Sequence, residues 1–202
     1  LAEQDGLWVI SDEVYEHMVF DGQMHQSALR RPALAARTIH VASFGKTLHV
    51  TGWKVGYVIA PEALTHAIRA VHQFNTFTVA TPLQLGIATY LNKHPNATHA
   101  LPAFYQAKRD AFRAGLSQTA LKLLPCQGTY FQLVDYSGLA QFAQMSDVQF
   151  AEHLTTELKV AAIPLTPFYG YAPEQKIVRF CFAKKQETLN AAVDNLKQGL
   201  SA

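Results

Sequence analysis

The fold is decided by the stretch Ser43-Phe44-Gly45-Lys46-Thr47-Leu48-His49-Val50-Thr51-Gly52-Trp53-Lys54-Val55-Gly56, which sets a lysine among small and hydroxyl residues. The preceding run, Thr38-Ile39-His40-Val41-Ala42, consists of β-branched and small residues and predicts a buried strand. Lys46 is then expected just past the carboxyl end of that strand, where open α/β sheets bind their ligands. Most lysines are solvated loop residues. The surroundings of Lys46 make it a candidate for covalent chemistry instead.

Two nucleotide-binding patterns do not fit this stretch. A P-loop needs a glycine five positions before Gly45, and the residue there is His40. No G-x-G-x-x-G loop follows a strand-like segment, so the sequence gives no support for a nicotinamide or flavin fold.

An acidic residue and a phenol lie upstream, at the end of another predicted strand. The apolar run Leu7–Ile10 is followed by Ser11-Asp12-Glu13-Val14-Tyr15, which puts Asp12 at the strand end and Tyr15 one helical turn further. Adjacent residues at a strand end point apart, so only one of Asp12 and Glu13 can face a ligand.

This set of residues matches the requirements of pyridoxal phosphate. The cofactor needs a carboxylate against its pyridine nitrogen, a lysine for a Schiff base, a donor to its ring oxygen, and hydroxyl and cationic groups for its phosphate. Asp12, Lys46 and Tyr15 supply the first three, and Ser43 and Lys54 supply the phosphate groups.

In the order and spacing of these residues the chain resembles the fold-type I, pyridoxal-phosphate-dependent aminotransferases of classes I and II. The matching segments are Asp12-x-x-Tyr15, Ser43-x-x-Lys46, Thr51-Gly52-Trp53-Lys54-Val55-Gly56, and Arg179 in Val178-Arg179-Phe180-Cys181-Phe182. The resemblance runs from Leu1 nearly to the end of the chain. It is greatest to the branch of bacterial methionine aminotransferases, kynurenine aminotransferases and glutamine transaminase K.

The resemblance implies an α/β fold in two parts. Residues 1–99 would form the C-terminal part of the large cofactor-binding domain, and residues 100–202 a small α+β C-terminal domain. The family places a phosphate loop and a stacking aromatic residue before the aspartate. The chain therefore looks like the C-terminal half of an enzyme, and Leu1–Gly6 reads as a helix end capped by Gly6. Whether residues 1–202 alone are active or bind the cofactor is left open.

The resemblance also implies the reaction and the roles of the site residues. An amino group would pass between an amino acid, methionine or one with an aromatic or similar apolar side chain, and a 2-oxo acid through a Schiff base on Lys46. Asp12, Tyr15, Ser43 and Lys54 would bind the cofactor, and Arg179 the substrate carboxylate. Most members carry arginine in place of Lys54. Lysine is a point charge rather than a planar fork, so the phosphate would be held less directionally.

Several alternatives stay open. The same cofactor residues serve a carbon-sulfur β-lyase, and a non-enzymatic cofactor-sensing domain or an inactive fragment would also keep them. Arg179 lies within an apolar run, where an unpaired charge is costly, so it binds either a protein carboxylate or a substrate. The aromatic residues Phe168, Tyr169 and Tyr171 either line a substrate pocket or pack the small domain.

Composition excludes other classes of partner. The chain has 202 residues with a net charge of +2, and its basic residues form no run, so no nucleic-acid surface is expected. No apolar stretch approaches the roughly 20 residues that span a bilayer. The two cysteines, Cys126 and Cys181, fit reduced thiols in a cytoplasmic protein. The nine histidines form no metal-binding motif.

The family's active sites lie at a dimer interface, so a homodimer is expected, with the Thr76–Thr81 loop contacting the partner subunit.

Hydrophobic periodicity predicts alternating strands and helices. Ser146 and Gln149 have the capping-box spacing at a helix start. The predicted strands are Leu7–Ile10, Thr38–Ala42, Val55–Ala60, Thr129–Tyr136, Val160–Leu165 and Lys176–Phe182. Five helices are predicted. The first starts at Pro61, with Leu64, Ile68, Val71 and Phe74 at helical spacing, the second starts at Pro82, and the third contains Phe104, Lys108, Phe112 and Leu116. The last two span Ser146–Leu158 and Gln186–Leu200.

Overall fold

The computed structural model describes residues 6–171, 173 and 175–200. The chain divides into two compact units, Leu1–Pro102 and Ala103–Ala202, against the expected domains 1–99 and 100–202. The expected helix end at Leu1–Gly6 falls on residues 1–5, outside the described residues.

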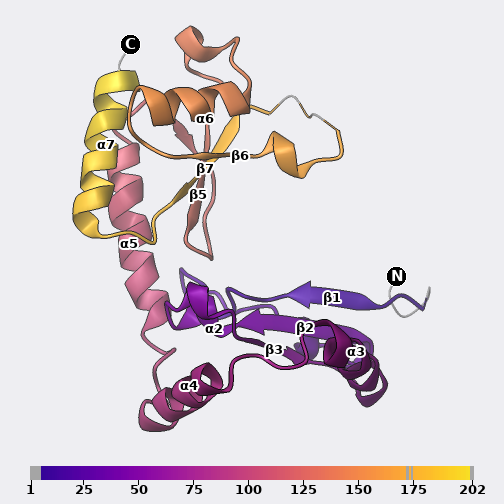
Figure 1. Cartoon of the computed structure of the whole chain (residues 1–202). Coiled ribbons are helices and arrows are strands. Elements are labelled where there is room, and N and C mark those ends of the chain that lie inside the picture. Colours follow the sequence, from indigo (N-terminus) through magenta and orange to yellow (C-terminus); the bar gives the residue numbers. More distant parts are fainter. Residues whose placement is uncertain (1–5, 172, 174, 201–202) are drawn as a thin grey trace. The chain divides into compact units, whose positions relative to one another are not determined.

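The first unit contains a three-stranded mixed sheet in the order β1-β2-β3 (Figure 1). Its strands are β1 (Val9–Asp12), β2 (Thr38–Ser43) and β3 (Gly56–Ile59). The β1 strand runs parallel to β2 with Asp12 opposite Val41, and β3 runs antiparallel to β2 with Gly56 opposite Ser43. The carboxyl ends of β1 and β2 therefore meet the start of β3 at one edge of the sheet.

Helices and turns join these strands. The predicted helices at Pro61 and Pro82 are present, but α3 buries none of its side chains within this unit. Val71 and Phe74, which continue its apolar stripe, are 68% and 87% exposed. The elements are η1 (Ala28–Arg30), α1 (Pro32–Ala35), α2 (Phe44–Thr47), η2 (Thr51–Trp53), α3 (Glu62–Asn75) and α4 (Thr81–Lys93).

The second unit is an antiparallel sheet in the order β4-β5-β7-β6 with three long helices. The predicted strand Val160–Leu165 is reduced to two residues, Ile163–Pro164, which pair with β7. The elements are α5 (Leu101–Leu116), β4 (Lys122–Leu123), β5 (Phe131–Asp135), η3 (Ala140–Phe142), α6 (Asp147–Thr156), β6 (Ile163–Pro164), η4 (Thr166–Phe168), β7 (Ile177–Cys181) and α7 (Gln186–Leu200).

Strand alternation gives this sheet two unlike faces. Val178 and Phe180 of β7 are buried, and the Phe180 ring meets Phe112 of α5 edge-on at a centroid distance of 6.1 Å. Arg179, between them, points to the opposite face. The capping box predicted for α6 is confirmed, since Ser146 Oγ accepts from Gln149 N at 3.2 Å and Gln149 Oε1 accepts from Ser146 N at 2.9 Å.

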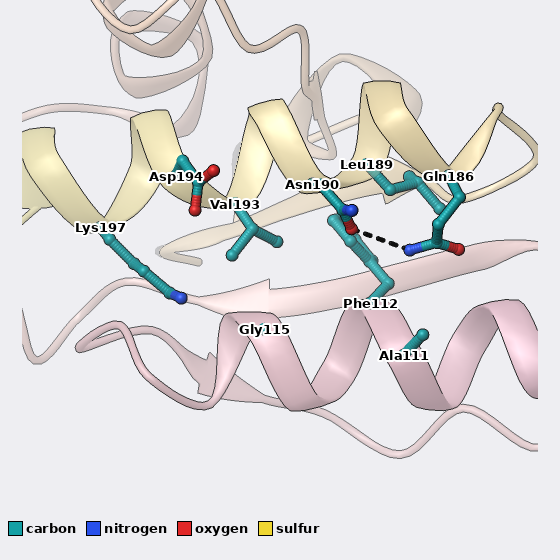
Figure 2. A pocket seen from close by; sticks show the side chains of 9 residues that line it. All are labelled: Ala111, Phe112, Gly115, Gln186, Leu189, Asn190, Val193, Asp194 and Lys197. Atoms are coloured by element: carbon teal, nitrogen blue, oxygen red, sulfur yellow. Dashed lines mark hydrogen bonds between the residues drawn. The ribbon is translucent and has the colours of Figure 1, made fainter.

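Helices α5 and α7 lie side by side on the buried face (Figure 1). Gly115 of α5 permits their close approach, because a Cβ atom there would lie 2.7 and 2.9 Å from the two γ-methyl groups of Val193 on α7. Figure 2 shows these residues at a cavity of about 270 Å³ between the two helices, which contains none of the predicted site residues.

We predict that Gly115→Ala lowers the free energy of unfolding by about 1–3 kcal/mol, because the stiff Val193 side chain cannot move away. Urea unfolding of the whole protein measures this change. In a Val193→Ala background the cost of Gly115→Ala should disappear, since the clashing methyl groups are gone. An equal cost in both backgrounds would show that the contact is not its cause.

Candidate active site

Two adjacent carboxylates at the end of β1 point to opposite sides. Asp12 is exposed, whereas Glu13 is 6% exposed. The expectation that adjacent side chains at this strand end point apart is confirmed. Asp12 Oδ1 accepts a hydrogen bond from Val14 N at 3.2 Å, which starts the turn that carries Tyr15.

The Lys46 turn begins where β2 ends. Ser43 caps the short helix α2, and its Oγ accepts a hydrogen bond from Gly45 N at 3.1 Å. The hydroxyl of Ser43 keeps its single O–H hydrogen for a further acceptor. Lys46 is half-buried in this turn. Val41 pairs with Asp12 across the sheet, and Lys46 follows Val41 by five residues. The Lys46 turn therefore lies at the same edge of the sheet as Asp12.

A left-handed residue brings the second lysine to this edge. Lys54 has φ +55° and ψ +39°, which reverses the chain just before β3. Position 56 has to be glycine because β3 approaches β2 closely there. A Cβ atom at Gly56 would lie 2.5 Å from the carbonyl oxygen of Ala42. Gly56 pairs with Ser43, so the backbone of Lys54 lies beyond the end of β2. These contacts explain the Lys-Val-Gly spacing in physical terms.

The buried carboxylate of Glu13 accepts hydrogen bonds from several segments close to the end of β1. Glu13 accepts hydrogen bonds from Ser11 Oγ at 2.8 Å, from Ala28 N at 3.0 Å and from His25 Nε2 at 2.6 Å. His40 of β2 is also buried, and its Nδ1 lies 3.3 Å from Glu13 Oε1. Burial alone would raise the pKa of Glu13, but the hydrogen bonds from His25, Ala28 N and two serines outweigh it and lower that pKa to about 2.

The ring of Tyr57 on β3 lies next to this cluster of Glu13, His25 and His40. It packs against His40 and Phe44, with centroid distances of 6.0 and 5.1 Å. Its hydroxyl donates to Glu16 Oε1, and burial together with this hydrogen bond raises the pKa of Tyr57. The sequence reasoning missed Glu13, His25, His40 and Tyr57 as a group. His40 and Tyr57 were signalled as polar residues within strand-like runs, whereas no local pattern pointed to His25.

The donor set at the sheet edge fits pyridoxal phosphate. Lys46 offers an amine, Asp12 an exposed carboxylate, and Ser43 and Lys54 a hydroxyl and a cation, all from positions that the β1-β2-β3 register brings to one edge. Each matches one chemical requirement of the cofactor.

The predicted substrate arginine lies in the second unit. Among the described residues no carboxylate pairs with the Arg179 guanidinium, and its buried Nε has no hydrogen-bond partner there. The Cζ atom lies 4.2 Å from the centroid of the Phe131 ring and 5.7 Å from that of Phe168. A half-buried cation held by aromatic rings is prepared to bind an anion.

The aromatic residues that follow β6 do not pack the small domain. Phe168, Tyr169 and Tyr171 are 70%, 41% and 71% exposed, and the rings of the two tyrosines lie 5.8 Å apart. Of the two alternatives, these exposures favour a surface open to ligand.

Other kinds of site find no support within the described part of the chain. No three His, Cys, Asp or Glu side chains there come together as a metal site. None of the described helices is long and apolar enough to cross a membrane.

The fold matches that of solved fold-type I aminotransferases over about half of their chains. The chain belongs to the class I and II aminotransferase family, whose model, "Aminotransferase class I and II", matches residues 1–196.

Individual proteins that the chain is similar to are also aminotransferases by name. The chain is 50% identical over 192 residues to a methionine aminotransferase of Escherichia coli, covering 95% of this chain and 49% of the relative. It is 40% identical over 208 residues to a kynurenine–oxoglutarate transaminase of Dictyostelium discoideum, covering 93% and 47%. The solved structure of YbdL from Escherichia coli, described as having a methionine aminotransferase function, superposes with a TM-score of 0.90 at 50% identity, covering 95% of this chain and 50% of that one. The chain thus spans about half the length of the curated relatives it matches.

The Glu13 cluster generates a prediction about pH. A carboxylate whose pKa falls from 4.5 to about 2 on folding stabilises the fold above pH 4.5, and this contribution is lost as the pH falls toward 2. The contribution is on the order of 3 kcal/mol. We therefore expect Glu13→Gln to reduce stability near neutral pH and to flatten its loss between pH 4.5 and 2.

Urea unfolding of the whole protein across that range measures the effect. Glu62→Gln is the matched control, because the side chain of Glu62 is 92% exposed and should leave the pH dependence nearly unchanged. Parallel pH profiles for wild type and Glu13→Gln would contradict the assignment.

Proposed function

We propose that the whole protein is a pyridoxal-phosphate-dependent aminotransferase that transfers an amino group between an amino acid with an apolar side chain, such as methionine or an aromatic residue, and a 2-oxo acid. The observation that carries this proposal is the register of β1, β2 and β3, which brings Asp12, Ser43, Lys46 and Lys54 to one sheet edge. The names of the relatives described above favour amino transfer over β-elimination.

Each residue at the sheet edge has a distinct task in this proposal. Lys46 would hold the cofactor covalently and, once displaced by the substrate amine, its Nζ would carry the proton that leaves the substrate α-carbon. The Asp12 carboxylate would keep the pyridine nitrogen protonated. The Tyr15 hydroxyl would donate to the ring oxygen, and Ser43 and Lys54 would hold the phosphate. When bound, the cofactor supplies an electron sink for the α-carbon.

Arg179 would orient the substrate. Its guanidinium presents a planar fork that matches the α-carboxylate of both the amino acid and the oxo acid. Fixing the carboxylate limits rotation about the α-carbon, so that the bond to be broken stands in one orientation. The support is a half-buried cation without a carboxylate partner among the described residues.

The whole protein is further proposed to be a cytoplasmic homodimer, with the Thr76–Thr81 loop at the subunit interface. Phe77 in this loop has φ +65° and is 76% exposed. Such a conformation is costly for an aromatic residue unless its surroundings hold it, as a partner subunit would. Among the described strands β1 pairs with β2 alone, and Leu7, Trp8 and Ile10 in or just before β1 are more than half exposed, so the rest of the whole protein would cover this side of the sheet.

For the assembly, we predict that residues 1–202 alone bind the cofactor poorly and do not transaminate, whereas the whole protein is an active dimer. Light scattering after size exclusion measures the mass, and Phe77→Asp should shift it toward monomer. Met24→Asp, at a loop residue that is 63% exposed, is the control. A fragment as active as the whole protein would refute the proposal.

For the covalent attachment, borohydride reduction of the whole protein with bound cofactor should place the phosphopyridoxyl label on Lys46. Peptide mapping by mass spectrometry locates the label. Lys54, at the same sheet edge, serves as an internal control and should stay unlabelled. A label on any lysine other than Lys46 would overturn the assignment.

For the ring partner, Asp12→Ala should lower kcat by more than about tenfold, a barrier increase above ~1.4 kcal/mol, with a smaller effect on substrate binding. The carboxylate acts on charge that develops during the reaction, so kcat is the sensitive quantity. Steady-state kinetics with methionine and a 2-oxo acid measure both constants. If kcat stays within tenfold of wild type, Asp12 is not the partner of the ring nitrogen.

A further inference from the structure

A second buried carboxylate lies at the start of α6 in the second unit. Asp147 is 1% exposed. Its Oδ2 accepts hydrogen bonds from the backbone N–H groups of Leu165 and Thr166, both at 2.7 Å. Its Oδ1 accepts from Thr166 Oγ1 at 2.6 Å and from Val148 N at 2.9 Å. Three of these four donors belong to the two residues that follow β6.

The strand before this segment gives it a short anchor. Within the described part of the chain β6 is two residues long, pairs with β7 alone, and contains Pro164, which cannot donate to a ladder. At Leu165 the backbone turns to helical angles and leaves the sheet. The bonds to Asp147 therefore fix the point at which the Thr166–Phe168 turn starts.

That turn carries an aromatic ring to the Arg179 guanidinium. Ile163 pairs with Arg179 in the sheet, and Phe168, further along the same segment, places its ring 5.7 Å from Arg179 Cζ. Phe131 of β5 places its ring 4.2 Å from the same atom. Aromatic contacts restrict the rotation of the guanidinium plane and leave its N–H edge for an anion.

We propose that Asp147 is a positioning residue for Arg179, acting through the Thr166–Phe168 turn and the Phe168 ring to fix the guanidinium for the substrate carboxylate. This inference rests on the proposed function, since it takes Arg179 as the carboxylate-binding group. Asp147 itself touches neither substrate nor cofactor.

The chemistry of the carboxylate supports the assignment. Each Asp147 oxygen accepts two hydrogen bonds, and all four donors are neutral groups. In Asp147→Asn one oxygen becomes an NH2 group, which would face at least one backbone N–H that it cannot accept from. The oxygen that remains is a neutral amide oxygen and a weaker acceptor than a carboxylate, so the turn would be held less strongly while the side chain keeps its size. Thr166→Val removes one donor and leaves the backbone bonds in place.

The test uses steady-state kinetics of the whole protein with bound cofactor. Asp147→Asn should raise KM for amino acid and 2-oxo acid, and Ki for a simple monocarboxylate inhibitor, by about tenfold, because a misplaced binding group weakens carboxylate contacts. Thr166→Val should raise them less. The cofactor absorbance spectrum, and the single-turnover rate with a primary amine lacking the carboxylate, should stay at wild-type values.

Ser146→Ala is the matched control. It removes the hydrogen bond from Gln149 N to Ser146 Oγ at the start of the same helix but leaves the bonds that Leu165 and Thr166 donate to Asp147. A purely structural role for Asp147 would make Ser146→Ala raise KM as much as Asp147→Asn, and that result would overturn the proposal. If Asp147→Asn does not fold, the comparison of Thr166→Val with Ser146→Ala decides, and equal KM values for these two would overturn the proposal.

Arg179→Lys separates this inference from the proposed function. A raised KM for Arg179→Lys with a wild-type KM for Asp147→Asn refutes the positioning role alone. An unchanged KM for Arg179→Lys refutes the carboxylate-binding role of Arg179 in the proposed function.

Discussion

The parallel pairing of β1 with β2, continued by the antiparallel β3, is the constraint on which the candidate site depends. Parallel strands end at the same edge, so Asp12 and the Ser43–Lys46 turn come together although a long segment separates them in sequence. The antiparallel strand adds its own start, and with it Lys54, to that edge. A shift of β1 by one residue would turn Asp12 into the interior and Glu13 toward solvent.

Two buried carboxylates stabilise the two units in a similar way. Glu13 lies beneath the sheet edge of the first unit, and Asp147 beneath the turn next to Arg179 in the second. Each accepts several hydrogen bonds from loop segments, which compensate for the loss of water around the charge. In both units a buried anion accepts hydrogen bonds from the backbone of a segment distant in sequence, Ala28 in the first and Leu165 and Thr166 in the second.

The exposed apolar side chains fit a chain that spans about half the length of its curated relatives. In the first unit α3 buries no side chain, and among the described strands β1 has a neighbour on one side only. The second unit has a fuller core, with Val134, Val178 and Phe182 completely buried among its helices and strands. Burial of apolar area is the main favourable term in folding, so the first unit gains less from its own contacts.

The sequence by itself determined the family and the α/β character, and it predicted which residues would be chemically active. Those residues form contiguous motifs whose residue types follow from the cofactor's chemistry, as with Lys46 after a β-branched run. It also predicted most strands and helices, and the capping box at Ser146, because these depend on local periodicity and local hydrogen bonds.

Only the tertiary structure decided which residues support the site. Glu13 contacts His25 and His40, and Asp147 contacts Thr166, across separations that no local pattern encodes. The structure also placed Arg179 between two aromatic rings with no carboxylate partner among the described residues, a question that the apolar run around it had left open. Such contacts depend on strand register and on which polar groups lose water on folding, and both are properties of the packed chain.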